Sequence, residues 1–304
     1  MKKFPLLLLK RTLCVLLLSA TSLVRADNWF MSASAGGTTG AYKDSQFRDR
    51  MWEAGARISG EYLDTGGLGF GYTKSKVYMK NGAVATDQNA AFLSGKLNFR
   101  PDGVAGRITT RLDRHSVNNN DATGNTDNVG VWAPQVSYLK SDGTFYADLG
   151  YAGSRYQNQL DVQQWTPTIG FGFNGGADWI QLRSYQIGHL NPARASGLTS
   201  SSALDAKWTH SFGSKSQAIP TSVTVGALLG QRIYAVDMDV QSVSNLADIQ
   251  RGGVSVALEW LVAPKTKVLL FGGQNRFREV KATDTTVRND YRLNVGYAGV
   301  TMDW

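Results

Sequence analysis

Residues 51–63, MWEAGARISGEYL, alternate between two kinds of side chain. Between 52 and 62 the even positions are apolar or glycine, and the odd positions carry three charges, at Glu53, Arg57 and Glu61. Successive side chains of a β-strand point to opposite faces, so one face of this strand is apolar and the other is charged. The segment therefore predicts an amphipathic β-strand.

The same alternation recurs along the chain in segments of about ten residues, separated by turn-forming residues. Fourteen such strands are predicted, at 28–36, 51–63, 67–78, 88–100, 103–114, 128–140, 144–156, 163–174, 177–188, 202–213, 219–234, 251–263, 266–278 and 288–304. Short and long connections alternate between them. The long ones are rich in Asn, Asp, Ser, Thr and Gly, and include 37–50, 115–127, 189–201 and 235–250.

Amphipathic antiparallel strands fit either a soluble sandwich or barrel, with the apolar face inside, or a transmembrane barrel, with the apolar face on lipid. Tryptophan placement favours the second, because bilayer interfaces select two belts of aromatic residues. Seven of the eight tryptophans lie near a strand end: Trp29, Trp52, Trp132, Trp165, Trp179, Trp260 and Trp304. The pattern predicts an all-β fold, a closed antiparallel up-and-down transmembrane β-barrel of about 14 strands in the bacterial outer membrane, with both mature termini periplasmic.

The first 26 residues have a basic start, an apolar run and small or branched residues at Val24 and Ala26, which is the layout of a secretory signal peptide. A membrane anchor helix is the weaker interpretation, because the apolar run is too short to span a bilayer. We expect residues 1–26 to be cleaved and 27–304 to form the barrel domain. The leader holds five of the 32 basic residues and none of the 24 acidic ones, which leaves 27 against 24 and a net charge of +3.

The basic isoelectric point therefore belongs mostly to the leader and does not indicate nucleic-acid binding. The only cysteine, Cys14, also lies there, so the mature chain is expected to have no disulfide and no cysteine-based metal site.

The chain ends on Tyr297-Ala-Gly-Val-Thr-Met-Asp-Trp304. This segment resembles the C-terminal β-signal of bacterial outer-membrane proteins, carried here by Tyr297, Gly299, Met302 and Trp304. The resemblance implies recognition by the barrel-assembly machinery and pairing of the last strand with the first. Chain length and strand number resemble those of monomeric 14-stranded porins.

Two local irregularities are expected in the strands. The apolar face of the last strand contains Met302 and Val300 when counted back from the end, but Leu293 and Tyr297 when counted forward from Tyr291. The two phases differ by one residue, so a bulge is predicted near Gly299. Bulges or weakened pairing are also predicted at Pro134 and Pro167, because proline has no N–H to donate.

The face opposite the apolar one defines the expected pore lining: Glu53, Arg57, Glu61, Lys96, Arg107, Arg111, Tyr146, Arg183, Tyr185, Lys207 and Glu259, with Arg292 on the last strand. Such a lumen is a hydrated path for polar solutes, or else a self-neutralising ladder of ion pairs. Arg107 and Arg111 would favour anions or acidic sugars. Tyr146 and Tyr185 would stack on sugar rings.

No catalytic residue, cofactor or metal is assigned, and the chain is not expected to be an enzyme. His115 and Ser116 are adjacent, so they point to opposite faces of a strand, and a solvated histidine is the preferred interpretation. The oxygen-rich stretch 118–128 only weakly resembles a calcium loop, since it lacks the closing glutamate.

The leading hypothesis is an outer-membrane, porin-like channel for passive passage of polar solutes, with anionic or sugar-like molecules as the candidates. The first alternative is the barrel of an exopolysaccharide or polymer export system with periplasmic export partners. The second is a structural or adhesive barrel with a closed lumen. Expected partners are outer-membrane lipid, the barrel-assembly machinery and a polar solute or saccharide, and no nucleic acid.

Overall fold

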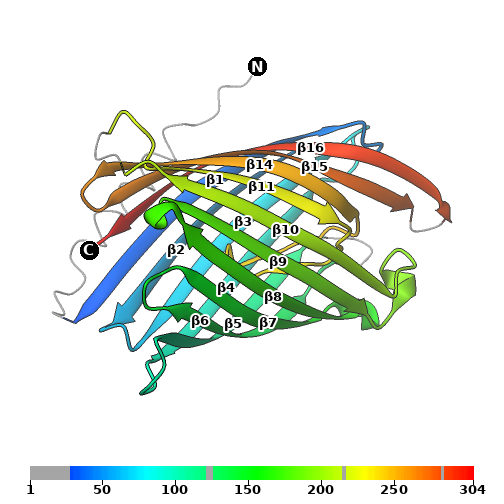
Figure 1. Ribbon diagram of the computed structural model, residues 1–304. Helices are drawn as coiled ribbons and strands as arrows, with labels where there is room; N and C mark the ends of the chain where they lie inside the picture. Colours follow the sequence, from blue (N-terminus) through cyan, green and yellow to red (C-terminus); the bar gives the residue numbers. More distant parts are fainter. Residues whose placement is uncertain (1–27, 121–125, 214–216, 282–283) are drawn as a thin grey trace.

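The computed structural model describes residues 28–120, 126–213, 217–281 and 284–304, and shows one antiparallel barrel (Figure 1). The predicted leader and residues 121–125 of the calcium-like stretch lie outside the described residues. The barrel strands are β1 (Trp29–Lys43), β2 (Arg48–Tyr62), β3 (Gly66–Met79), β4 (Thr86–Phe99), β5 (Gly106–Asn119), β6 (Val129–Lys140), β7 (Phe145–Arg155), β8 (Asp161–Phe173), β9 (Asp178–His189), β10 (Ser200–Ser211), β11 (Ser222–Gly230), β14 (Ile249–Ala263), β15 (Thr266–Lys281) and β16 (Asp284–Asp303).

Each barrel strand pairs with its neighbour in the chain, and β1 pairs with β16, so the sheet closes on itself. Closure satisfies the backbone hydrogen bonds of both would-be edge strands. Fourteen closed antiparallel strands confirm the predicted fold class.

One predicted long connection is wrong. β1 continues to Lys43 and β2 starts at Arg48, so residues 37–50 are mostly strand and the connection is only four residues long. The composition of 37–43 suggests a loop, but Tyr42 packs 5.7 Å from Tyr291 between ring centroids, and this contact keeps the segment in the sheet.

The outward face of the barrel is apolar. Its exposed side chains include Phe70, Leu93, Leu112, Val136, Ile169, Phe171, Ile180, Val225, Val256 and Leu270. Exposed tryptophans lie on it as well, and Trp132 and Trp165 are 54% and 50% exposed. Trp179 differs, because its ring lies over the lumen-facing Gly170, so it does not belong to an outer belt. A continuous apolar exterior is what a bilayer requires of a transmembrane barrel.

Within the described ranges, no helix is long and apolar enough to cross a membrane. The helical segments in the described residues are three short 3-10 turns: η1 (Gln157–Gln159), η2 (Asn174–Gly176) and η3 (Pro192–Arg194).

The last strand contains no bulge near Gly299. Its register to β1 and to β15 is continuous from Arg292 to Met302, so that prediction is wrong. Tyr291 and Leu293 are buried inside the barrel, and Arg292 faces outward, where it pairs with Asp44. The facing predicted for 291–297 is therefore reversed, because the lumen wall is itself apolar at this level.

The two prolines interrupt pairing without shifting it. Gln135 and Trp132 keep the same register to β7, although no pairs form at the two positions between them. The ladder between β8 and β9 has the same gap at 166 and 167. Of the two outcomes predicted at Pro134 and Pro167, strand pairing is weakened, but no bulge forms.

The chain end closes the barrel seam. Backbone hydrogen bonds of 3.0 Å join Trp304 and Met31 in both directions. Beside them the Tyr297 ring covers Gly36 and Gly299 on the lumen face, where a methyl carbon added to either glycine would overlap the tyrosine hydroxyl. Two residues of the predicted β-signal, Tyr297 and Gly299, thus pack against each other in the folded barrel.

Replacing Gly299 with alanine is expected to destabilise the seam by about 1–3 kcal/mol, the usual cost of overpacking. Thermal unfolding in detergent measures the effect. Gly296→Ala is the matched control, because in the described structure the added carbon meets open space. Adding Tyr297→Ala to Gly299→Ala should recover part of the loss, and no recovery would contradict this packing.

Candidate solute pathway

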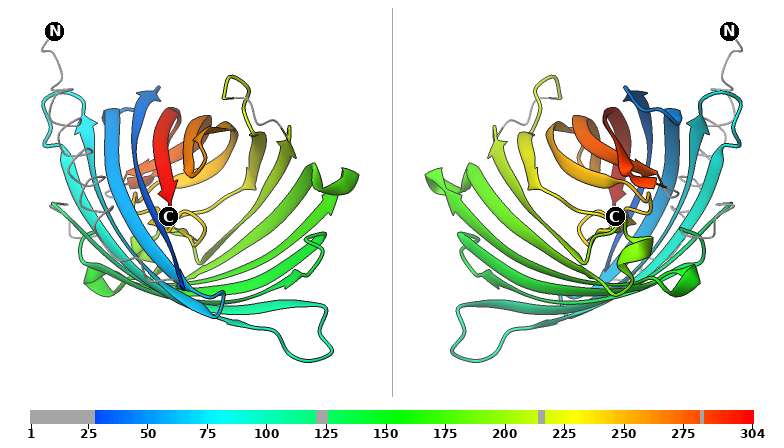
Figure 2. Two further views of the ribbon diagram at one scale, coloured as in Figure 1. Left: turned by 90° about the vertical axis from the view of Figure 1, so that its left-hand side faces the viewer. Right: turned by 90° about the vertical axis from the view of Figure 1, so that its right-hand side faces the viewer.

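The connection between β11 and β14 turns into the barrel. β11 ends at Gly230, whose φ of 97° suits glycine, and residues 231–248 then cross the lumen. Figure 2 shows this yellow segment inside the ring of strands. It contains the short pair β12 (Val236–Asp237) and β13 (Ser242–Val243). We call residues 231–248 the inward loop.

An apolar cluster holds the inward loop against one side of the wall. Ile233, Tyr234, Val236 and Met238 of the loop are at most 3% exposed. They pack with buried wall residues of β5 to β9, namely Val117, Val129, Val131, Ala133, Ala152, Val162, Tyr185 and Ile187. The lumen is therefore apolar on this side, whereas the strand pattern predicts a polar lumen throughout.

Gln164 fixes the loop backbone. Its amide Nε2 donates to the carbonyl of Val236 at 2.7 Å, and its Oε1 accepts from the N–H of the same residue at 2.9 Å. Gln164 is only 1% exposed, so the paired bonds lie in a dry environment, where leaving either group unpaired costs about 1–3 kcal/mol.

Arg183 forms the charged attachment of the loop. Its guanidinium lies 2.8 Å from Asp239 and 3.6 Å from Asp237 of the loop, and 3.7 Å from Asp148 of the wall. Burial opposes ionisation of Asp237, but the positive charges of Arg183, Lys207 and Arg232 outweigh it and hold its pKa below the usual value. Asp237 is consequently charged at neutral pH, and the attachment is an ion-pair network.

The far end of the loop is tied to the barrel seam. Asp248 pairs with Arg48 at 2.5 Å and accepts a hydrogen bond from the Tyr291 hydroxyl at 2.6 Å. Burial raises the pKa of Asp248, and these two partners offset the effect only in part. Asn245 adds a bond of 2.9 Å to Gln88 on β4. The inward loop is thus attached to opposite sides of the lumen.

The strand register places the eleven predicted lining residues on the lumen face, the face on which Arg183 meets the inward loop. Most are in local pairs: Lys96 with Glu61 at 2.7 Å, Arg107 with Asp64 at 2.5 Å, Arg111 with Asp113 at 2.7 Å, Lys207 with Asp205 at 3.2 Å, Glu259 with Lys267 at 3.7 Å, and Tyr146 with Asp148 at 2.7 Å. Among the described residues, Arg57 and Glu53 form no ion pair. They are the unpaired charges among the eleven predicted lining residues.

Tyr185 is not available for stacking on a sugar. It is fully buried, Arg232 covers its ring at 4.7 Å, and its hydroxyl donates to Asp237 at 3.2 Å. His115 also differs from expectation, because it is 2% exposed on the lumen face beside Phe92 and is not solvated.

Two cavities lie along the β1–β5 wall, and the second of them also touches the inward loop. A cavity of 590 Å³ at the short-turn end is lined by Arg57, Lys96 and Arg111. A second, of 460 Å³, lies against the loop and is lined by Glu53, Gln88 and Asn275. On β2 only Gly55 separates Glu53 from Arg57 along the lumen face. The two cavities therefore approach each other along β2.

Sequence reasoning misses the inward loop, since it assigns 235–250 to an outer loop and 219–234 to a strand. One signal is present: the apolar run from Ile233 to Val236, followed by Met238, is unusual for a solvated loop.

No family model matches the chain, and no curated protein matches it. Among solved structures, the Pseudomonas putida toluene transporter TodX has a TM-score of 0.55 at 7% identity, over 91% of this chain and 89% of that one. A TodX monoaromatic hydrocarbon channel mutant has a TM-score of 0.51 at 9% identity, over 91% and 90%. Pseudomonas aeruginosa OccK7 has a TM-score of 0.45 at 11% identity, over 92% and 99%.

At these identities the likeness to TodX shows the fold. A closed 14-stranded antiparallel barrel with an apolar exterior is the architecture of a bacterial outer-membrane barrel.

Proposed function

We propose that the protein is a narrow outer-membrane channel through which small polar solutes pass between the inward loop and the β1–β5 wall. The observation that carries this proposal is the pair of cavities that approach each other along β2. The short turns and both ends of the barrel domain are proposed to be periplasmic, and Tyr297, Gly299, Met302 and Trp304 to form the assembly signal.

The unpaired guanidinium of Arg57 supports a preference for anions. The other cations of the β2–β5 wall, Lys96, Arg107 and Arg111, are neutralised by Glu61, Asp64 and Asp113. In the described part of the chain Arg57 has no acidic partner within 4.0 Å, so its charge is free to attract a carboxylate or another anionic group. Unpaired guanidinium groups are strong ligands for such groups.

Planar-bilayer recording tests the proposal directly. We expect small, steady single-channel currents, because the inward loop is attached at several points. A folded preparation that never conducts would overturn the proposal.

The Arg57→Gln variant is expected to lose much of the anion preference while keeping its conductance within about twofold, since the side chain is shortened but no ion pair is broken. The reversal potential in a salt gradient measures the change. Arg155→Gln is the control, because Arg155 is 86% exposed at the long-loop rim. An unchanged reversal potential in Arg57→Gln would contradict the assigned role of this residue.

A further inference from the structure

A recess lies in the outer wall where β11 is shorter than its neighbours. β10 pairs with β11 only from Ala203 to Ser211, because β11 ends at Gly230. The first residues of β10, Ser200 and Ser201, pair with β9 on one side. On the side of β11 they have no strand partner among the described residues. The wall is therefore incomplete at its long-loop edge, beside the point where the chain turns inward.

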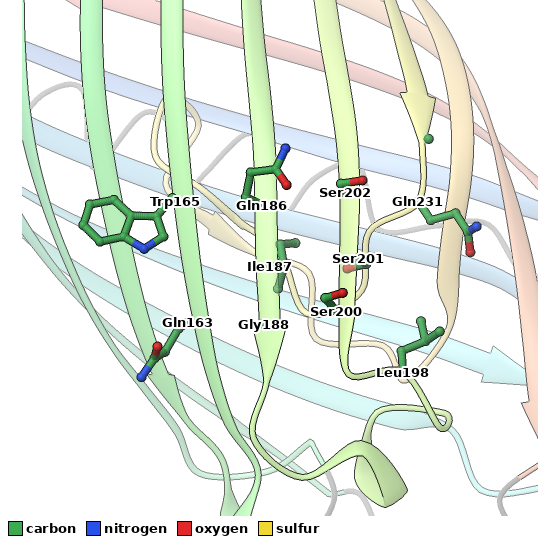
Figure 3. A pocket seen from close by; sticks show the side chains of 11 residues that line it. Gln163, Trp165, Gln186, Ile187, Gly188, Leu198, Ser200, Ser201, Ser202 and Gln231 are labelled. Carbon is green, nitrogen blue, oxygen red and sulfur yellow. The ribbon is translucent and has the colours of Figure 1, made fainter.

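The recess has a volume of 630 Å³ and is lined by uncharged residues, including Gln163, Trp165, Gln186, Gly188, Ser200 and Ser202 (Figure 3). They form two rows across β8, β9 and β10. Trp165, Gln186 and Ser202 are register neighbours in one row, and Gln163, Gly188 and Ser200 in the other. Gly188 has no side chain, so the second row is lower at its centre. The space above it is open: a β-carbon added to Gly188 would come no closer than 3.9 Å to its nearest described neighbour, the carbonyl oxygen of Gln163.

The recess lies at the border of the apolar exterior. On the outward face of β8, Ile169 and Phe171 are exposed and apolar, Pro167 and Trp165 come next, and Gln163 follows toward the long-loop end. Tryptophan marks bilayer interfaces, so the recess is at the level of lipid headgroups and not in the hydrocarbon.

The lining chemistry narrows the class of ligand. None of the described lining residues is charged, which disfavours phosphate and carboxylate groups. Amides and hydroxyls both donate and accept hydrogen bonds, and among the described residues the side chains of Gln163, Ser200 and Ser202 have no protein partner. Trp165 adds a half-exposed flat apolar ring. A sugar ring matches this set, since it offers hydroxyl groups at its edge and an apolar C–H face.

We propose that this outer-wall recess binds an uncharged sugar ring at the membrane surface. The volume is within the range of about 300–1,000 Å³ typical of small-ligand sites, and it accommodates a disaccharide. The sugar is presented either as the headgroup of a glycolipid, whose chain then lies along Ile169 and Phe171, or as a soluble glycan. Solute passage through the lumen is not needed for this site.

Saturation-transfer NMR on the purified barrel in an uncharged polyoxyethylene detergent tests the site, with maltose and dodecyl maltoside as probes. We expect transfer to the sugar protons and at least tenfold weaker binding in a Trp165→Ala, Gln186→Ala double variant. Trp132→Ala is the matched control, because it removes an equally exposed outward tryptophan elsewhere on the rim. Thermal unfolding reports whether each variant is folded.

The two probes separate the two sources of sugar. Much tighter binding of the maltoside than of maltose supports a glycolipid, and equal affinities support a soluble glycan. Absence of transfer to both probes, or equal binding by the double variant and the wild-type protein when both are folded, would overturn the proposal.

Discussion

Replacing residues 233–247 with a short Gly-Ser linker is expected to raise single-channel conductance by roughly twofold or more, because a 14-stranded barrel is wide enough to hold an open pore. The inward loop fills part of that cross-section with Ile233, Tyr234, Val236 and Met238, all of which are buried against the wall. Its removal also exposes apolar wall residues to water, so some loss of stability is expected alongside the gain in current.

A control separates removal of the loop from general disturbance of the barrel. In the Gln164→Leu variant the loop remains but loses both hydrogen bonds to Val236. We expect this variant to show noisier currents of nearly wild-type size, since the apolar cluster and Arg183 still hold the loop. If loop replacement leaves the conductance unchanged, the inward loop does not limit flow.

Replacing Arg183 with methionine is expected to destabilise the barrel by about 3–5 kcal/mol, the typical cost of removing one partner from a buried ion pair. The side chain of Arg183 is 3% exposed, and that of Asp148 is fully buried. The substitution leaves Asp148, Asp237 and Asp239 without their guanidinium, so the loop should loosen around Asp237 and Asp239 and the lumen should become more selective for cations. Denaturant unfolding in liposomes and reversal potentials measure the two effects.

Arg155→Met is the matched control, because it breaks an exposed pair with Asp161 and should change stability by no more than about 0.5 kcal/mol. A double-mutant cycle with Asp239→Asn then isolates the contact between loop and wall. If the losses of unfolding free energy in Arg183→Met and Asp239→Asn simply add in the double variant, this ion pair does not hold the loop.

The barrel is predictable because its physical constraint is local. Every strand that separates lipid from a wetter interior must alternate, as residues 51–63 do, and every such strand is long enough to show the pattern. The same reasoning puts Arg57, Lys96 and Arg183 on one face, and the register places them on the lumen face together.

The inward loop is not predictable in the same way, because its position depends on contacts distant in sequence. Gln164 and Arg183 precede the loop residues that they bind by more than 50 residues, and nothing local marks them as partners. The loop also changes what the neighbouring wall requires. Where it packs, and where Tyr291 and Leu293 meet Tyr42, the lumen face is apolar, so hydrophobicity no longer identifies the lipid side. For this reason the predicted facing of 291–297 is reversed.

The most direct test of the proposed path is block of the current by a charged thiol reagent at Arg57→Cys. The only natural cysteine, Cys14, lies in the predicted leader, so the introduced thiol is expected to be unique in the mature barrel. We predict that the reagent reduces the single-channel current of Arg57→Cys but not that of Leu93→Cys, whose outward side chain is 56% exposed on the other face of the wall. Full current after confirmed modification of Arg57→Cys would contradict passage between the inward loop and the β1–β5 wall.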